Sequence, residues 1–161
     1  MTKLRGEFSP ATPLSPEEPL ARYVMDARRI DWANRLVKEQ QFYPDKARNE
    51  VSTFRVQSMS RSEISALGVS EVASKREPPL TLLGWGRFNV SIVKRASEAL
   101  LIDTTDDPED PMHPRHAAIR GWPDDDDPET RKGRMKLIAQ FFSDNATLEL
   151  TDEGDKIAAR K

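Results

Sequence analysis

The chain has 161 residues and a mass of 18.3 kDa, a length that suits one globular domain. Hydrophobic residues make up 37% of it and charged residues 32%, so we expect a modest core that carries long polar segments. The net charge of −2 argues against a basic protein that coats nucleic acid. There are no cysteines, which excludes disulfides, zinc–thiolate sites, iron–sulfur clusters and thiol catalysis.

Apolar runs are short throughout the sequence. None reaches the ~18–20 residues that a transmembrane helix needs. Residues 1–20 also lack the apolar centre of a signal peptide, because Glu7, Glu17 and Glu18 interrupt them. We therefore expect a cytoplasmic protein without membrane association.

The first nineteen residues are rich in proline. Pro10, Pro13, Pro16 and Pro19 recur at every third position, and few large apolar side chains lie between them. Proline disrupts helix interiors and sheet ladders, so this composition predicts a disordered lead over residues 1–19. A polyproline docking ligand is the alternative.

The next segments predict strands and a capped helix. Residues 20–25 suit either a short strand or the start of a helix, and the pair Tyr43-Pro44 ends any helix that precedes it. Alternation over residues 51–56 predicts a strand. Ser60 and Glu63 have the spacing of a capping box, which predicts a helix over residues 61–75.

The second half of the chain predicts further strands and helices. Strands are expected at residues 80–83, 100–102, 117–119 and 148–150, and a short helix capped by Asn89 at 90–98. Asp127 followed by Pro128 and Glu129 predicts a further helix start. One apolar stripe supports that helix, formed by Met135, Ile138, Ala139 and Phe142.

Strands and helices do not alternate regularly along the chain, so the order predicts an α+β fold. We expect a small mixed sheet with helices mainly on one face. Residues 20–150 would form the single domain, and residues 151–161 a frayed tail.

Charge is distributed unevenly. Residues 103–129 hold ten acidic residues against Arg115 and Arg120, a net charge of −8, which leaves +6 for the remainder. Neither acidic run has the alternate carboxylates, glycine turn and distal Glu of a calcium loop. We interpret them as solvated loops and expect no metal.

Both histidines, His113 and His116, lie in residues 112–123, between the acidic runs. Three interpretations are open. A metal site could combine both with a nearby Asp. An acid–base site could use His116 with Arg120, Arg55 or Asp103 on a phosphodiester or nucleotide. In the structural alternative, His116 bonds to backbone and Trp122 packs in the core.

Cofactor motifs are absent. Gly84-Trp85-Gly86 lacks the third glycine of a dinucleotide loop, and no Walker lysine or nucleophile elbow occurs. Trp85 and Arg87 could stack on a base, but no continuous basic stripe accompanies them. We expect no cofactor, and nucleic-acid binding is only weakly supported.

Several blocks resemble a group of small bacterial proteins without assigned function. These blocks are Phe42–Pro44, Glu50–Arg55, Ser62–Gly68, Gly86-Arg87 and Pro114–Pro123. The resemblance spans roughly residues 40–123. It implies a bacterial intracellular protein folded over residues 40–142, and it carries no activity with it.

Two functions remain open. The first is a non-enzymatic accessory protein that acts through contacts with a protein partner, because no cofactor motif and few catalytic residue types are present. The alternative is a small enzyme acting on nucleotide or nucleic-acid phosphates. In that enzyme His116 is the acid–base residue, and Arg55 or Arg120 holds the anion.

Overall fold

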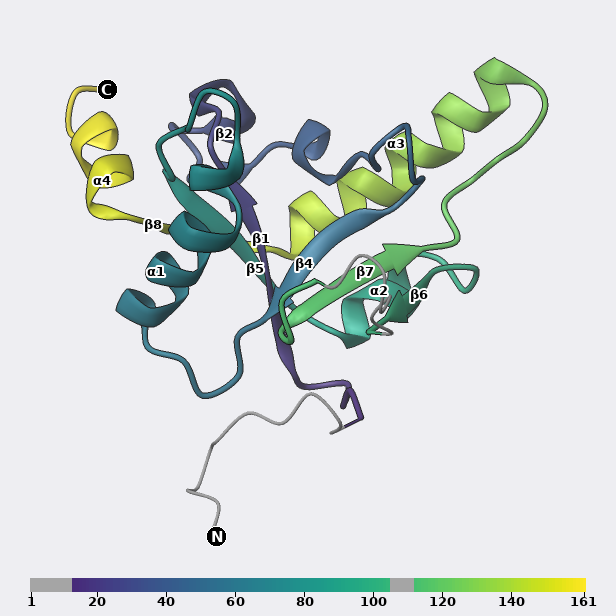
Figure 1. The fold of residues 1–161 in the computed structure, drawn as a ribbon. Coiled ribbons are helices and arrows are strands. Elements are labelled where there is room, and N and C mark those ends of the chain that lie inside the picture. Colours follow the sequence, from purple (N-terminus) through teal and green to yellow (C-terminus); the bar gives the residue numbers. More distant parts are fainter. Residues whose placement is uncertain (1–12, 105–111) are drawn as a thin grey trace, which may run out of the picture.

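The computed structural model describes residues 13–104 and 112–161. At its centre is a six-stranded sheet in the order β6-β7-β4-β1-β5-β8, with every neighbouring pair antiparallel (Figure 1). The α+β class is confirmed. The strands are β1 (Pro19–Val24), β4 (Val51–Arg55), β5 (Gly84–Asn89), β6 (Leu101–Asp103), β7 (His116–Arg120) and β8 (Thr147–Leu150). A separate two-stranded sheet pairs β2 (Ile30–Asp31) with β3 (Leu36–Val37).

Helices connect these strands. The α-helices are α1 (Arg61–Glu71), α2 (Ser91–Ala96), α3 (Pro128–Asn145) and α4 (Asp152–Ala158). Three 3-10 turns accompany them, η1 (Ala27–Arg29), η2 (Glu39–Phe42) and η3 (Ala73–Lys75). Within the described ranges, no helix has the length and apolar content to cross a membrane.

The sheet buries apolar side chains on both faces. Leu20 and Val24 of β1 belong to the larger core, which includes Phe142 of α3, whereas Ala21 and Tyr23 belong to a second core packed on α1. This split follows from the period of two along a strand. Figure 1 shows α3 behind the sheet and α1 in front of it. Helices therefore cover both faces rather than mainly one, and the sheet is antiparallel rather than mixed.

Local capping signals are confirmed. Ser60 Oγ accepts from the Glu63 amide at 3.1 Å, and Glu63 Oε1 accepts from the Ser60 amide at 3.0 Å, so the capping box is closed. The helix ends at Glu71, and the residues expected to form its last turn form the separate 3-10 turn η3 instead. Asp127 caps α3 as expected, with Pro128 as its first residue.

One strand begins later in the chain than expected, and one helix is shorter than expected. The strand predicted at residues 80–83 forms instead as β5, from Gly84, where a Cβ would lie 3.2 Å from Cα of Leu150. Only glycine lets β8 approach β5 so closely there. The predicted helix at 90–98 shortens to α2, whose N-cap residue is Val90 rather than Asn89 and makes no side-chain capping hydrogen bond.

Both ends of the described chain are more ordered than expected. Residues 13–19 are not a disordered lead: the Pro16 carbonyl accepts from the Ser91 amide at 2.9 Å, and Glu18 is buried. Residues 1–12 of that lead lie outside the described residues. The expected frayed tail contains α4, because Thr151 Oγ1 accepts from the Gly154 amide at 3.2 Å and donates to the Leu82 carbonyl at 2.8 Å.

Candidate functional site

The sheet opens between β1 and β4. These strands pair at only two positions, Leu20 with Arg55 and Ala21 with Phe54, whereas β1 and β5 pair along all of β1. Beyond Ala21 the strands separate, and side chains take over the missing backbone hydrogen bonds. Arg22 Nη1 donates to the Ser52 carbonyl at 3.0 Å, and the Gln41 side-chain amide donates to the Tyr23 carbonyl at 2.8 Å.

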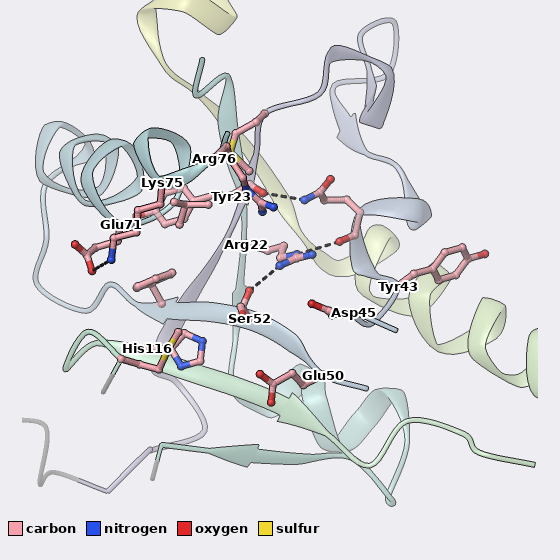
Figure 2. Close-up of a pocket in the computed structure, with 15 residues that line it drawn as sticks. Arg22, Tyr23, Tyr43, Asp45, Glu50, Ser52, Glu71, Lys75, Arg76 and His116 are labelled. Atoms are coloured by element: carbon pink, nitrogen blue, oxygen red, sulfur yellow. Dashed lines mark hydrogen bonds and ion pairs between the residues drawn. The ribbon is translucent and has the colours of Figure 1, made fainter. Parts of the chain in front are cut away.

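A cavity of about 500 Å³ lies at this opening. We call it the β1–β4 cleft and define it by Arg22, Ser52, Phe54, Arg76 and His116. Figure 2 shows Arg22 between Ser52 of β4 and the η2 turn, with His116 on the far side of Ser52. The volume falls within the roughly 300–1,000 Å³ typical of small-ligand sites.

Arg22 is held firmly in this cleft. Its Nε donates to the Gln41 carbonyl at 3.0 Å, so two carbonyls on different segments fix the plane of the guanidinium. A guanidinium has five N–H donors, and within the described part of the chain the others have no partner. Burial lowers the pKa of Arg22 to about 10, with further lowering by Arg76 and Arg29 and partial compensation by Asp45.

The other charges in the cleft are mostly paired. Lys75 Nζ lies 3.2 Å from Glu71 Oε1. Glu50 is directed at Arg120, with Oε2 2.8 Å from the Arg120 Nη1. Arg76 is exposed and forms no ion pair with any described residue, like Arg22. The cleft thus contains two guanidinium groups that form no ion pair within the described chain, although the Asp45 charge offsets part of the repulsion on Arg22.

His116 is the first residue of β7 and lies half-buried in the same cleft. Its ring packs edge-on against Phe54, with 5.6 Å between centroids and 80° between planes. His113 is excluded from the cleft lining, and its Nδ1 accepts from the Arg115 amide at 3.1 Å. Among the described residues, no three His, Asp or Glu side chains come together as metal ligands.

Arg55 and Arg120 lie elsewhere. Arg55 alternates with Phe54 along β4, so its side chain leaves the opposite face, where it pairs with buried Glu18. Arg120 ends β7, about 13 Å along the strand from His116, and pairs with Glu50 and Asp103. The structure therefore brings His116 together with Arg22 and Arg76 instead. A catalytic role of Arg55 or Arg120 stays a prediction.

Tyr23, the chain neighbour of Arg22, already has a hydrogen-bond partner. The Tyr23 hydroxyl donates to the Ile64 carbonyl at 2.6 Å, and burial raises its pKa above the ordinary value. It therefore serves as a wall of the cleft and not as a proton donor to a ligand. Sequence reasoning missed Arg22, although an arginine inside the apolar run 20–24 was a readable signal.

Comparison with known protein-family models, curated proteins and solved structures gives no match to this chain. The resemblance to small bacterial proteins stays a prediction, and function is inferred from the geometry of the cleft.

Proposed function

We propose that this protein is a small accessory module that binds an anionic group of a partner protein in the β1–β4 cleft. The observation that carries this proposal is Arg22, whose guanidinium is fixed by two carbonyls and forms no ion pair among the described residues. Arginine presents paired donors that match a carboxylate or a phosphate. Because the group is already held in place, little further conformational entropy is lost when an anion binds.

The rest of the cleft supports the same chemistry. Arg76 adds an exposed guanidinium, and its repulsion of Arg22 adds to burial, the larger cause, in lowering the pKa of Arg22. An anion bound between them would relieve that repulsion. Tyr23, Tyr43 and Phe54 add aromatic lining that suits an anionic group carried on an apolar or aromatic stem.

Short capped amino acids test this proposal. N-acetyl-phosphotyrosine amide and N-acetyl-glutamate amide offer a phosphate and a carboxylate, and N-acetyl-tyrosine amide is the neutral match. We expect saturable calorimetric binding of at least one anion, with amide shifts at Arg22 and Ser52 in NMR spectra, and none with the neutral compound. The affinity should fall as ionic strength rises.

Matched variants locate the binding. Arg76→Gln should weaken binding of the anion by about tenfold, the loss of one charge-assisted hydrogen bond. It should leave folding intact, since the Arg76 side chain is exposed and forms no ion pair with a described residue. Arg22→Gln should weaken binding at least as much. Arg160→Gln, on an exposed arginine of the chain end, is the control. Binding that is equal in all three variants would reject the cleft as the site.

Catalysis on phosphates is the second candidate, and one observation favours it: His116 lines the same cleft as both guanidinium groups. A histidine beside a bound phosphate can act as general acid or base. Its test is turnover of bis(p-nitrophenyl) phosphate. Activity that His116→Ala abolishes while anion affinity is retained would favour the enzyme over the accessory module.

A further inference from the structure

A second cavity, of about 800 Å³, adjoins the β1–β4 cleft. It lies between residues 43–49 and the first half of α3, and we call it the α3 groove. Tyr43 and Asp45 line both cavities, so the two meet along that short segment. A ligand held in one therefore has a continuous path over Tyr43 into the other.

The α3 groove has an apolar floor and a basic rim. Tyr43, Pro44, Pro123 and Met135 supply apolar surface, and Pro123 is buried. Among the described residues, four cations surround them, namely Lys46, Arg131, Lys132 and Lys136, against two carboxylates, Asp45 and Asp124. The excess of positive charge stands out in a chain whose net charge is −2.

The rim cations are only partly neutralised. Lys46 and Lys132 are exposed and form no ion pair within the described residues. Arg131 donates to the Asp125 carbonyl at 3.2 Å, and Lys136 Nζ lies 3.9 Å from Glu39 Oε1. Exposed and only partly paired charges such as these steer an oppositely charged partner more than they stabilise the fold.

We propose that the α3 groove binds an acidic, partly apolar peptide segment of the same partner, continuous with the anionic group in the β1–β4 cleft. This inference rests on the proposed function. Charge complementarity selects acidic residues for the rim, and the apolar floor selects at least one aliphatic side chain between them. A nucleic-acid strand fits less well, because Tyr43 is the single aromatic ring among the described lining residues and two carboxylates face the groove.

Joining the two sites through one peptide raises affinity without a new contact in either. The cleft fixes one end, so the second site sees its segment at high effective concentration. The probe is a synthetic peptide whose anionic residue, phosphotyrosine or glutamate as the cleft prefers, is followed by Glu-Glu-Leu-Glu-Glu-Leu. The capped single amino acid is its short counterpart. We expect the long peptide to bind about tenfold or more tightly than the short one.

Variants separate the two sites. Lys46→Glu and Lys132→Glu should remove the gain of the long peptide and leave the affinity of the short probe unchanged, whereas Arg76→Gln should weaken both. Arg160→Glu is the matched charge reversal and should change neither. None of these side chains has an ion pair in the described chain, so all four variants should fold.

The outcomes are distinct. If the short probe fails to bind, the proposed function fails, and this inference with it. If the short probe binds but the long peptide gains nothing, or gains equally in the lysine variants, the groove inference alone is overturned. Tighter binding of a single-stranded thymidine hexanucleotide, lost in Lys46→Glu and Lys132→Glu, also overturns it in favour of nucleic acid.

Discussion

Arg55 and Glu18 form a two-pronged ion pair that is closed to solvent. Nε of Arg55 lies 2.6 Å from Oε1 of Glu18 and Nη2 lies 3.0 Å from Oε2, with the side chains 2% and 3% exposed. The pair ties the segment before β1 to the end of β4, next to the two positions at which those strands pair. The attachment of the segment before β1 to the sheet therefore depends on a buried ion pair.

Glu18→Gln should destabilise the protein by about 3–5 kcal/mol, because it removes the carboxylate charge that both prongs of the buried guanidinium contact. Denaturant unfolding of Glu18→Gln beside Glu17→Gln, an exposed neighbour, measures this difference. Glu18→Leu combined with Arg55→Met should recover part of the loss, since neither charge then remains unpaired. A Glu18→Gln variant as stable as Glu17→Gln would contradict the structural role of the pair.

Gly68→Ala should destabilise by about 1–2 kcal/mol, although alanine is the better helix former by about 1 kcal/mol. A Cβ at position 68 would lie 2.6 Å from Cδ1 of Tyr23 and 2.8 Å from Cδ2 of Leu82. The Tyr23 ring cannot withdraw without losing the hydrogen bond from its hydroxyl to Ile64.

Gly133→Ala is the matched control, because a Cβ there meets no atom within 4 Å in α3. The free energy of unfolding of that variant should rise by about 1 kcal/mol from helix propensity alone. Thermal melts of the pair decide the point: equal gains at both positions would mean that α1 does not pack closely on Tyr23.

Asp127→Asn should lower stability at neutral pH and have less effect in acid. Hydrogen bonds from the Thr130 side chain, at 2.6 Å, and from its backbone amide lower the pKa of Asp127 below its ordinary value of about 3.9. A lowered folded-state pKa stabilises the protein above the unfolded pKa, and this stabilisation is lost as pH falls through the folded one.

Denaturant melts of both proteins between pH 7 and pH 2 measure the Asp127 contribution. Asparagine also caps helices, so the difference isolates the carboxylate charge at the α3 N-terminus. A difference in the free energy of unfolding between the two proteins that stays constant down to pH 2 would exclude the carboxylate charge as its source.

Trp122→Ala and His116→Ala should separate stability from function. Trp122 is 3% exposed, donates to the Ile119 carbonyl at 2.9 Å and packs 6.0 Å from the Phe142 ring, so its loss should cost about 3–5 kcal/mol. His116 loses its edge contact with Phe54, worth about 1 kcal/mol. If His116→Ala melts as low as Trp122→Ala, the histidine belongs to the core rather than to the cleft.

Local signals in the sequence predicted the parts of the fold that depend on neighbours in the chain. The capping box of α1 and the Asp127 cap of α3 each need residues three apart, and both formed as expected. Helix α4 also has a readable cap in Thr151. A frayed tail was nevertheless expected there. Gly154 within α4 is required by packing, since a Cβ there would lie 3.1 Å from the Leu83 carbonyl carbon.

The cleft could not be predicted in the same way, because its geometry is set by distant residues. Arg22 is held by Gln41 and Ser52, which lie 19 and 30 positions away in the chain, and by the separation of β1 from β4. The strand expected at residues 117–119 formed as β7, with His116 as its first residue. Whether His116 lies near Arg55 and Arg120 depends on the sheet face that each side chain leaves and on its position along the strand. Alternation alone does not assign either of these.

The position of β1 has a consequence for synthesis. β1 lies between β4 and β5 in the sheet but precedes both in the chain, so a ribosome delivers it before either neighbour exists. Until Arg55 has emerged, both of its edges and the side chains of Leu20, Tyr23 and Val24 lack their partners. Such a strand is a template for aggregation. A translational pause between Val24 and Arg55 should therefore lower the soluble yield more than the same pause placed after Asn89.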